Sequence, residues 1–188
     1  MPSVLDPVET DIARLVRGAR GGDRAAFAEL YRRFARMVHG VVLARIARSG
    51  RNDVDDIVQD VFVTALERLH ELREPAAFGG WLATIARHRA TDHGRRLHVM
   101  ETLADDVAVR DPDHLEALAI LETVRSLPDA YRETLILRLV EGMSGAEIAE
   151  RTGLTAASVR VNLHRGMKLL REKLTHERLP LGQMQPRD

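Results

Sequence analysis

The stretch that decides the fold spans residues 144–174 and has the sequence SGAEIAERTGLTAASVRVNLHRGMKLLREKL. Ser144 and Glu147 have the S-x-x-E spacing of a capping box, in which the hydroxyl and the carboxylate each accept a hydrogen bond from a free backbone N–H group. Gly153 can adopt the left-handed conformation that ends a helix, and Thr155 can cap the next one. The stretch therefore predicts a short helix, a tight turn and a longer second helix.

The predicted second helix has an apolar face and a basic face. The apolar residues recur three or four positions apart and are Val159, Leu163, Met167, Leu170 and Leu174. The basic residues lie mostly off that stripe and are Arg160, His164, Arg165, Lys168 and Arg171. This combination is typical of a helix-turn-helix, whose second helix enters the major groove of DNA. The alternative is an ordinary helical hairpin with a solvated basic face, but capping, spacing and one-sided charge together favour DNA binding.

Composition narrows the class of protein. The chain has 188 residues, of which 45% are hydrophobic and 4% aromatic, so it can bury a core and favours helices over sheet. It has no cysteine, which excludes disulfides and thiolate metal sites. No stretch has the pattern of a signal peptide or the roughly 20 apolar residues of a membrane helix. We expect a soluble, cytoplasmic protein.

Charge is balanced overall but segregated along the chain. The 28 basic and 28 acidic residues give no net charge, which by itself does not favour a nucleic-acid partner. However, residues 79–100 are mostly basic, residues 101–122 are mostly acidic, and residues 154–174 are basic again. Because local fields decide contact with DNA, this arrangement is compatible with two separate DNA-facing surfaces.

Helical periodicity also runs through the first half of the chain. Asp23 is predicted to cap a helix that extends to about residue 46, and Asp53 a second helix over residues 54–72. The apolar stripe of that second helix is formed by Val54, Ile57, Val58, Val61, Phe62, Ala65, Leu66, Leu69 and Leu72. On the opposite face lies a polar stripe formed by Asp56, Asp60, Thr64, Glu67 and Glu71. Such a stripe is either a solvated face or a docking face for a basic partner.

A third helix in this half is expected after a loop at residues 73–77. Its first turn contains Gly79 and Gly80, which disfavour helix, so it is predicted to begin later or to flex. Trp81 is expected in the core rather than as a platform for a stacked base. The other end of the helix is polar and mostly cationic.

The predicted fold class is all-α, with two small helical domains joined by a flexible acidic linker and the helix-turn-helix in the C-terminal one. Helices are expected at 114–127 and 131–141 before the helix-turn-helix, with Pro128 restarting the chain between them. The predicted segments are a leader and short helix at 1–22, a first domain at 23–98, a linker at 99–114, a second domain at 115–175 and a tail at 176–188.

Several stretches in fixed order resemble a bacterial RNA polymerase sigma factor of the extracytoplasmic-function (ECF) type. In the first half they are GDRAAFAELYRRF at 22–34, DVDDIVQDVFVTALERL at 53–69 and FGGWLATIARHRATDHGRR at 78–96. In the second half the stretch is LPDAYRETLILRLVEGMSGAEIAERTGLTAASVRVNLHRGMKLLREKL at 127–174. The resemblance extends over roughly residues 22–174.

The resemblance implies that 23–98 corresponds to sigma region two and 115–175 to sigma region four. It implies docking on the β′ clamp helices and β flap of core RNA polymerase, with polymerase-binding residues Asp53, Asp56, Gln59 and Asp60. It implies contacts to the promoter −10 element from Arg73, Phe78, Arg87, His88, Thr91, Asp92, Arg95 and Arg96. It implies contacts to the −35 element from Thr155, Ala157, Ser158, Arg160, Val161, His164, Arg165 and Lys168. It also implies an anti-sigma factor as a partner. No cofactor, metal, membrane or small-molecule substrate is expected.

Two other functions are weighed against a sigma factor. A one-component transcription regulator that binds an operator as a dimer would also use a helix-turn-helix, but it has no need of two separated DNA-facing surfaces. An enzyme is disfavoured because the sequence has no P-loop, nucleophile elbow or dinucleotide-binding turn. The spacing of His88, His93 and His98 moreover rotates them around a helix and away from a shared metal site.

Overall fold

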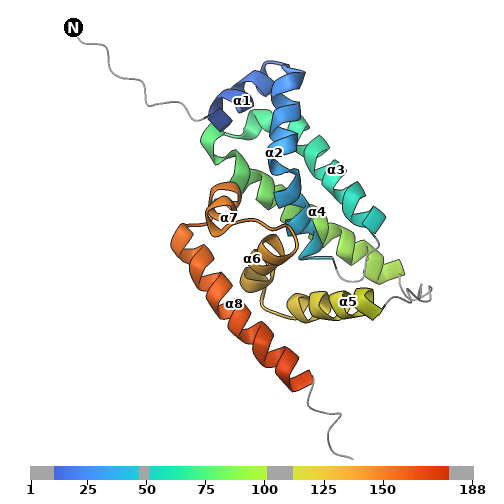
Figure 1. The fold of residues 1–188 in the computed structure, drawn as a ribbon. Coiled ribbons are helices and arrows are strands. Elements are labelled where there is room, and N and C mark those ends of the chain that lie inside the picture. Colours follow the sequence, from blue (N-terminus) through green and yellow to red (C-terminus); the bar gives the residue numbers. More distant parts are fainter. Residues whose placement is uncertain (1–10, 47–50, 101–111, 178–188) are drawn as a thin grey trace, which may run out of the picture.

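The computed structural model describes residues 11–46, 51–100 and 112–177, and within these ranges every regular element is a helix (Figure 1). The N-terminal half contains α1 (Asp11–Arg20), α2 (Arg24–Leu43), α3 (Arg51–Glu67), η1 (Leu69–Glu71), η2 (Pro75–Ala77) and α4 (Phe78–Met100). The C-terminal half contains α5 (Pro112–Arg125), α6 (Asp129–Leu139), α7 (Gly145–Thr152) and α8 (Ala156–Glu177). The all-α prediction is confirmed.

The start of α2 follows the sequence prediction, but α3 differs from it at both ends. The Asp23 carboxylate caps α2 by accepting hydrogen bonds from the N–H groups of Ala25 and Ala26. Asp53 lies in the first turn of α3 rather than at its cap, where a negative charge still interacts favourably with the helix dipole.

Helix α3 also ends earlier than predicted, at Glu67 instead of residue 72. The Arg20 guanidinium donates hydrogen bonds to the carbonyl groups of Leu69 and Leu72. Because these carbonyl groups accept hydrogen bonds from a side chain of another helix, they do not need a further α-helical turn to satisfy them. The buried side chains of Leu69 and Leu72 anchor the short turn η1 that replaces it.

The expected loop at 73–77 contains the short turn η2, which begins with Pro75. Helix α4 begins directly after it, at Phe78. The expectation that Gly79 and Gly80 delay the start of this helix is therefore wrong. Phe78 is fully buried and packs edge-on against Phe34 of α2, with ring centroids 5.1 Å apart. This packing fixes the first turn despite the glycines.

The helix-turn-helix has the predicted geometry. The Ser144 N–H donates to the Glu147 carboxylate at 2.8 Å, and the Glu147 N–H donates to the Ser144 hydroxyl at 3.2 Å, which completes the capping box. Gly153 ends α7 in the left-handed conformation with φ 75°. The Thr155 hydroxyl accepts a hydrogen bond from the N–H of Ser158 at 3.1 Å and so caps α8.

The predicted linker overlaps helices at both of its ends. Helix α4 extends to Met100 and α5 begins at Pro112, whose missing N–H suits the first turn of a helix. The remainder of the predicted linker, the leader at 1–10 and most of the predicted tail lie outside the described residues. Helix α8 continues to Glu177, past the predicted end at residue 175.

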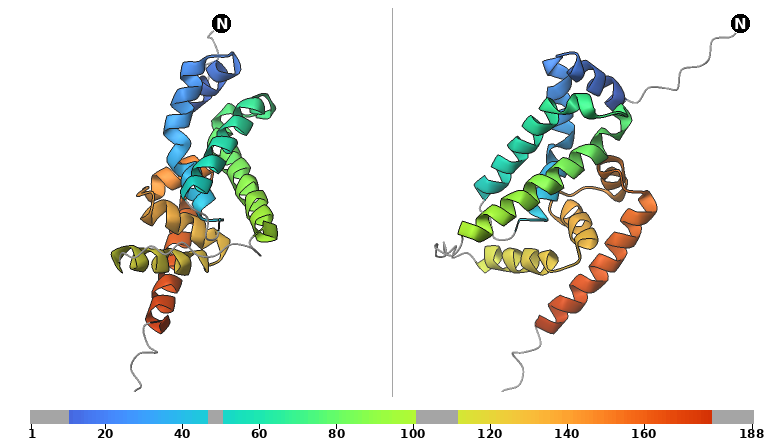
Figure 2. Two further views of the ribbon diagram at one scale, coloured as in Figure 1. Left: turned by 90° about the vertical axis from the view of Figure 1, so that its right-hand side faces the viewer. Right: turned by 180° about the vertical axis from the view of Figure 1, so that it is seen from behind.

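The two halves pack against each other and share core residues (Figures 1 and 2). Leu137, Met143, Ile148 and Val159 of the C-terminal half belong to the same buried cluster as the core of α2, α3 and α4. In the other direction, Ala44 joins the cluster formed by α5, α6 and α8. Helix α8 runs along the outer edge of the C-terminal half, and its end projects beyond the other helices (Figure 2).

Candidate nucleic-acid interface

The outer face of α8 is open to solvent. Val159 and Leu170 of the predicted stripe are buried, whereas Leu163, Met167 and Leu174 are half-buried. Every residue predicted to contact the −35 element is exposed, namely Thr155, Ala157, Ser158, Arg160, Val161, His164, Arg165 and Lys168. The helix therefore presents its positive charge on the side facing away from the core, as a helix that enters a DNA groove must do.

The packing of α8 on α6 depends on a glycine. A Cβ atom at Gly166 would lie 3.0 Å from Leu135 Cδ1 and 3.1 Å from Tyr131 Cβ, closer than ordinary van der Waals contact. The absence of a side chain thus allows the two helix backbones to approach each other. This close contact fixes the orientation of α8 and keeps its basic face outward.

The acidic face of α3 is likewise exposed at Asp56, Gln59 and Asp60, while Asp53 is half-buried. Two of the predicted assignments along α3 are wrong. Thr64, expected on the outer face, is buried; its hydroxyl donates to the Asp60 carbonyl and accepts from Arg89 of α4, both at 2.7 Å. Leu66, expected in the apolar stripe, is 49% exposed.

The exposed side of α3 is consequently acidic with an apolar component. Val63, like Leu66, has 49% of its surface exposed beside the carboxylates. Buried hydrophobic residues on the opposite side, such as Ile57 and Val61, hold α3 against α2 and α4. An exposed helix face that combines carboxylates with apolar side chains has the chemistry of a protein-docking surface.

The residues predicted to contact the −10 element lie on helix α4 and in the turn before it, and they differ in how exposed they are. Arg73, His88, Thr91 and Asp92 are exposed. The side chains of Arg95 and Arg96, in the last turns of α4, lie outside the described part of the chain. Phe78 is fully buried between Phe34 and Trp81, so the expectation that it contacts DNA does not agree with its position in this arrangement.

Arg87 is the predicted DNA contact that the structure pairs with another residue. Its guanidinium binds the Glu133 carboxylate of α6 through two hydrogen bonds, Nη2 to Oε1 at 2.7 Å and Nε to Oε2 at 3.0 Å. The hydrogen bonds that Arg87 donates to the Glu133 carboxylate raise the pKa of Arg87 above its ordinary value, against the opposing effect of burial. Arg87 is therefore charged and held in place, with 27% of its side chain exposed.

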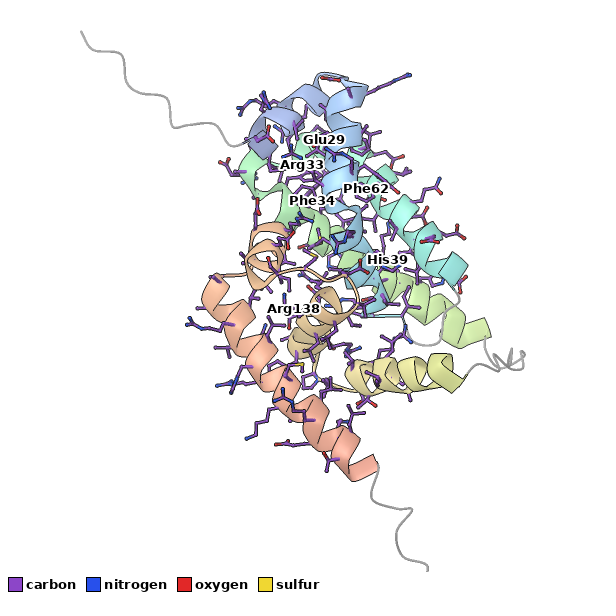
Figure 3. The ribbon with its side chains drawn as sticks, in the orientation of Figure 1. Glu29, Arg33, Phe34, His39, Phe62 and Arg138 are labelled. Carbon is purple, nitrogen blue, oxygen red and sulfur yellow. The ribbon has the colours of Figure 1, made fainter. Side chains whose placement is uncertain are left out.

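Further contacts between the halves involve residues that the sequence did not single out. Arg45 Nη2 lies 3.3 Å from the second oxygen of Glu133, and His39 Nδ1 lies 2.6 Å from Glu141 Oε1 (His39 is labelled in Figure 3). The sequence does contain one signal for the position of Glu133, because this acidic residue directly precedes the mostly apolar run TLIL in α6. Charged residues are rarely fully buried unless they are paired.

Other kinds of site find no support among the described residues. The described part of the chain contains no group of three His, Asp or Glu side chains arranged to hold a metal ion. None of its helices is long and apolar enough to cross a lipid bilayer. The features that stand out are thus the basic face of α8, the acidic face of α3 and the polar face of α4.

Comparison with known sequences assigns the two halves to families. Residues 30–98 match Sigma-70 region 2, and residues 117–170 match Sigma-70, region 4. The sigma factor NccH of Alcaligenes xylosoxydans xylosoxydans is 33% identical, in a match covering 86% of this chain and 91% of NccH. The sigma factor CarQ of Myxococcus xanthus is 31% identical, covering 82% of this chain and 92% of CarQ. The ECF sigma-E factor of Haemophilus influenzae is 29% identical, covering 85% and 93%.

Solved structures agree with this assignment. CnrH, determined in complex with the cytosolic domain of CnrY, superposes with a TM-score of 0.61 and 26% identity, covering 88% of this chain and 97% of CnrH. The sigma factor RpoE of Bartonella quintana, determined with the anti-sigma factor NepR, has a TM-score of 0.51 at 19% identity, over 79% of this chain and 96% of that one. The second comparison supports the fold alone.

These matches define the chain as an RNA polymerase sigma factor of the Sigma-70 type. Within that class, it belongs to the extracytoplasmic-function (ECF) family. As a sigma factor it binds core RNA polymerase and directs promoter recognition, DNA opening and transcription initiation. The alternative of a dimeric operator-binding regulator is wrong, because the Sigma-70 matches include the half that lies before the helix-turn-helix.

Proposed function

We propose that the exposed acidic face of α3 is the surface that docks on core polymerase, through Asp53, Asp56, Gln59 and Asp60 against the β′ clamp helices. The observation that supports this most strongly is the exposure of Asp56, Gln59 and Asp60 beside Val63 and Leu66, on a helix whose other side is fixed in the core. Carboxylates guide the encounter with a basic partner, and exposed apolar side chains add buried area once contact is made.

The DNA contacts are proposed to be divided between the halves. Residues 23–98 act as region two, with Arg73, Arg87, His88, Thr91, Asp92, Arg95 and Arg96 directed to the −10 element. Residues 115–175 act as region four, with the exposed face of α8 directed to the −35 element and further contact to the β flap. The exposure of the α8 face and its basic charge support the second assignment. Arginine and lysine neutralise phosphates, and arginine also recognises guanine edges.

The remaining partners follow from the family. We expect an anti-sigma factor to bind this chain, as the cytosolic domain of CnrY binds CnrH in the solved complex. The protein acts by binding and positioning rather than by catalysing a reaction itself, and it works where RNA polymerase and the chromosome are, in the cytoplasm.

Transcription by core polymerase from a promoter library, with and without the full chain, tests this proposal. We expect initiation at start sites that share two spaced sequence motifs. Asp56→Arg and Asp60→Arg should each raise the chain concentration needed for half-maximal transcription by at least about tenfold, because like charges would face each other at the docking surface. Glu150→Arg is the matched control, since it reverses an exposed carboxylate on α7. Equal effects of all three variants would contradict the assignment of α3.

A further inference from the structure

Glu133 connects both halves of the molecule through a buried carboxylate. Only 6% of its side chain is exposed, and the groups that satisfy its charge are Arg87 of α4 and Arg45, just after α2. Both arginines belong to the N-terminal half, whereas Glu133 belongs to α6. If the halves separate, all three groups become accessible to water. The ion pairs therefore stabilise the packing of the halves rather than the folding of either one.

Glycines allow the halves to come this close. A Cβ atom at Gly40 of α2 would lie 2.6 Å from Leu137 Cδ2 and 2.9 Å from Glu141 Cγ, both in the C-terminal half. A Cβ atom at Gly79 would lie 2.5 Å from the Arg151 carbonyl oxygen. The turn of the helix-turn-helix thus rests on the first turn of α4, and the glycines that weaken that turn in isolation are needed for this contact.

The arrangement in which the two halves share this interface is called here the closed arrangement. The Arg87 guanidinium donates two parallel hydrogen bonds to Glu133, which is also the geometry in which arginine binds a phosphate group. Glu133 takes the edge of the guanidinium formed by Nε and Nη2, so this edge cannot bind a phosphate while the pair is intact. The carboxylate of Glu133 consequently occupies one of the two edges through which Arg87 could bind a DNA phosphate.

We propose that Glu133 acts as an internal substitute for DNA phosphate, which holds the chain closed and keeps Arg87 from the −10 region until the halves separate. This inference rests on the proposed role of Arg87 in DNA binding. It assigns a regulatory contact to the chain's own residues, independent of any other protein. The concentration of chain needed for promoter opening then depends on the fraction of molecules that are open.

The distance between the halves can be followed in the full chain because it has no cysteine of its own. Cysteines introduced at the exposed positions Glu67 of α3 and Glu172 of α8 would take a fluorescent donor and acceptor. We expect strong energy transfer in the otherwise unchanged chain. Glu133→Gln should raise the ratio of open to closed molecules by roughly tenfold, because it leaves Arg87 without a charged partner at the interface and Arg45 with only the exposed Asp129.

Gly40→Ala provides a second route to opening that removes no charge. It favours helix in α2 and so preserves the N-terminal half, but its Cβ atom meets Leu137, which is fully buried and has little room to move. It should also lower energy transfer. Glu150→Gln, which neutralises an exposed carboxylate on α7, is the control and should leave transfer unchanged.

A transcription assay with core polymerase separates the two parts of the inference. If both opening variants lower energy transfer and reduce the concentration for half-maximal transcription by a similar factor, the proposal is supported. If neither variant changes energy transfer, the closed arrangement does not depend on Glu133 and the proposal is overturned. If energy transfer falls but the concentration for half-maximal transcription does not, the proposal that Glu133 takes the place of a DNA phosphate is overturned. Docking through α3 is not affected by this outcome, because it has a separate test.

Discussion

The two DNA-facing helices differ in how much of the molecule each depends on. The basic face of α8 is complete within the C-terminal half, and all of its predicted contact residues are exposed. In α4, Phe78 lies in the core and Arg87 is held by a carboxylate of the other half. Exposure of one helix therefore follows from local folding, whereas availability of the other depends on the interface between halves. A charged residue on a polar helix face is not necessarily free to bind a ligand.

The largest expected effect tests whether the shared core is one structural unit. Leu137→Ala removes a fully buried side chain that contacts both halves, and we expect it to lower the free energy of unfolding by about 2–5 kcal/mol. Val161→Ala, at a position 41% exposed on α8, should change it by less than about 0.5 kcal/mol. Urea unfolding of the full chain measures both. Similar losses for the two variants would show that the α8 face is not independent of the core.

A second prediction concerns DNA binding by α8. Arg160→Ala should weaken binding of the polymerase–sigma complex to −35 DNA by about 1–3 kcal/mol, because the exposed guanidinium lies in the first turns of the helix that enters the groove. Arg171→Ala, exposed on the same helix but outside the predicted contact set, serves as the control. Binding measured as a function of salt concentration distinguishes the two. Equal losses would mean that α8 contributes general charge rather than a defined contact face.

A smaller effect is expected at the start of α7. Ser144→Ala removes one side of the capping box and should destabilise α7 by about 1 kcal/mol. Hydrogen exchange of the α7 amides should accelerate while exchange in α3 stays unchanged. Thr175→Ala, which removes an exposed hydroxyl near the end of α8, should leave α7 unaffected. Uniform acceleration in all helices after Ser144→Ala would contradict a local role for the cap.

The smallest expected effect is a loss of stability of α7 at acidic pH. The pKa of Glu147 lies below its ordinary 4.5. The largest cause is the hydrogen bond that its carboxylate accepts from the Ser144 N–H, and the interaction with the Ser144 hydroxyl is the second cause. Because the folded pKa is lowered, the stabilisation is present above pH 4.5 and is lost as the pH falls through the folded pKa. Exchange protection of α7 should therefore decline in that acidic range. In Glu147→Gln the decline should be weaker, whereas Glu150→Gln should retain it.

The features that follow from local sequence were predicted well. The capping box, the left-handed Gly153 and the apolar stripe of α8 depend on residues within a few positions of each other. The exposure of the acidic face of α3 follows from its periodicity in the same way. Local signals thus predicted the all-helical fold and most of the side chains on α3 and α8 that are open to solvent.

Features that depend on distant residues were not predicted. Glu133 and Arg87 are separated by 46 positions, and no periodicity relates them. Thr64 is buried because Arg89 of α4 binds its hydroxyl, and α3 ends early because Arg20 of α1 binds the following carbonyl groups. Helical periodicity gives the direction of a side chain, but the neighbouring helix decides whether that direction is covered.

Gly153 illustrates how one position can satisfy two unrelated requirements. Its positive φ ends α7, which asparagine also tolerates at helix ends. Yet a Cβ atom at Gly153 would lie 3.1 Å from Gly80 Cα, so any side chain there has to displace the backbone of α4. Gly153→Asn should consequently preserve the turn while loosening the contact between halves. Tolerance of a substitution by the isolated DNA-binding fold is therefore no guide to its tolerance in the whole chain.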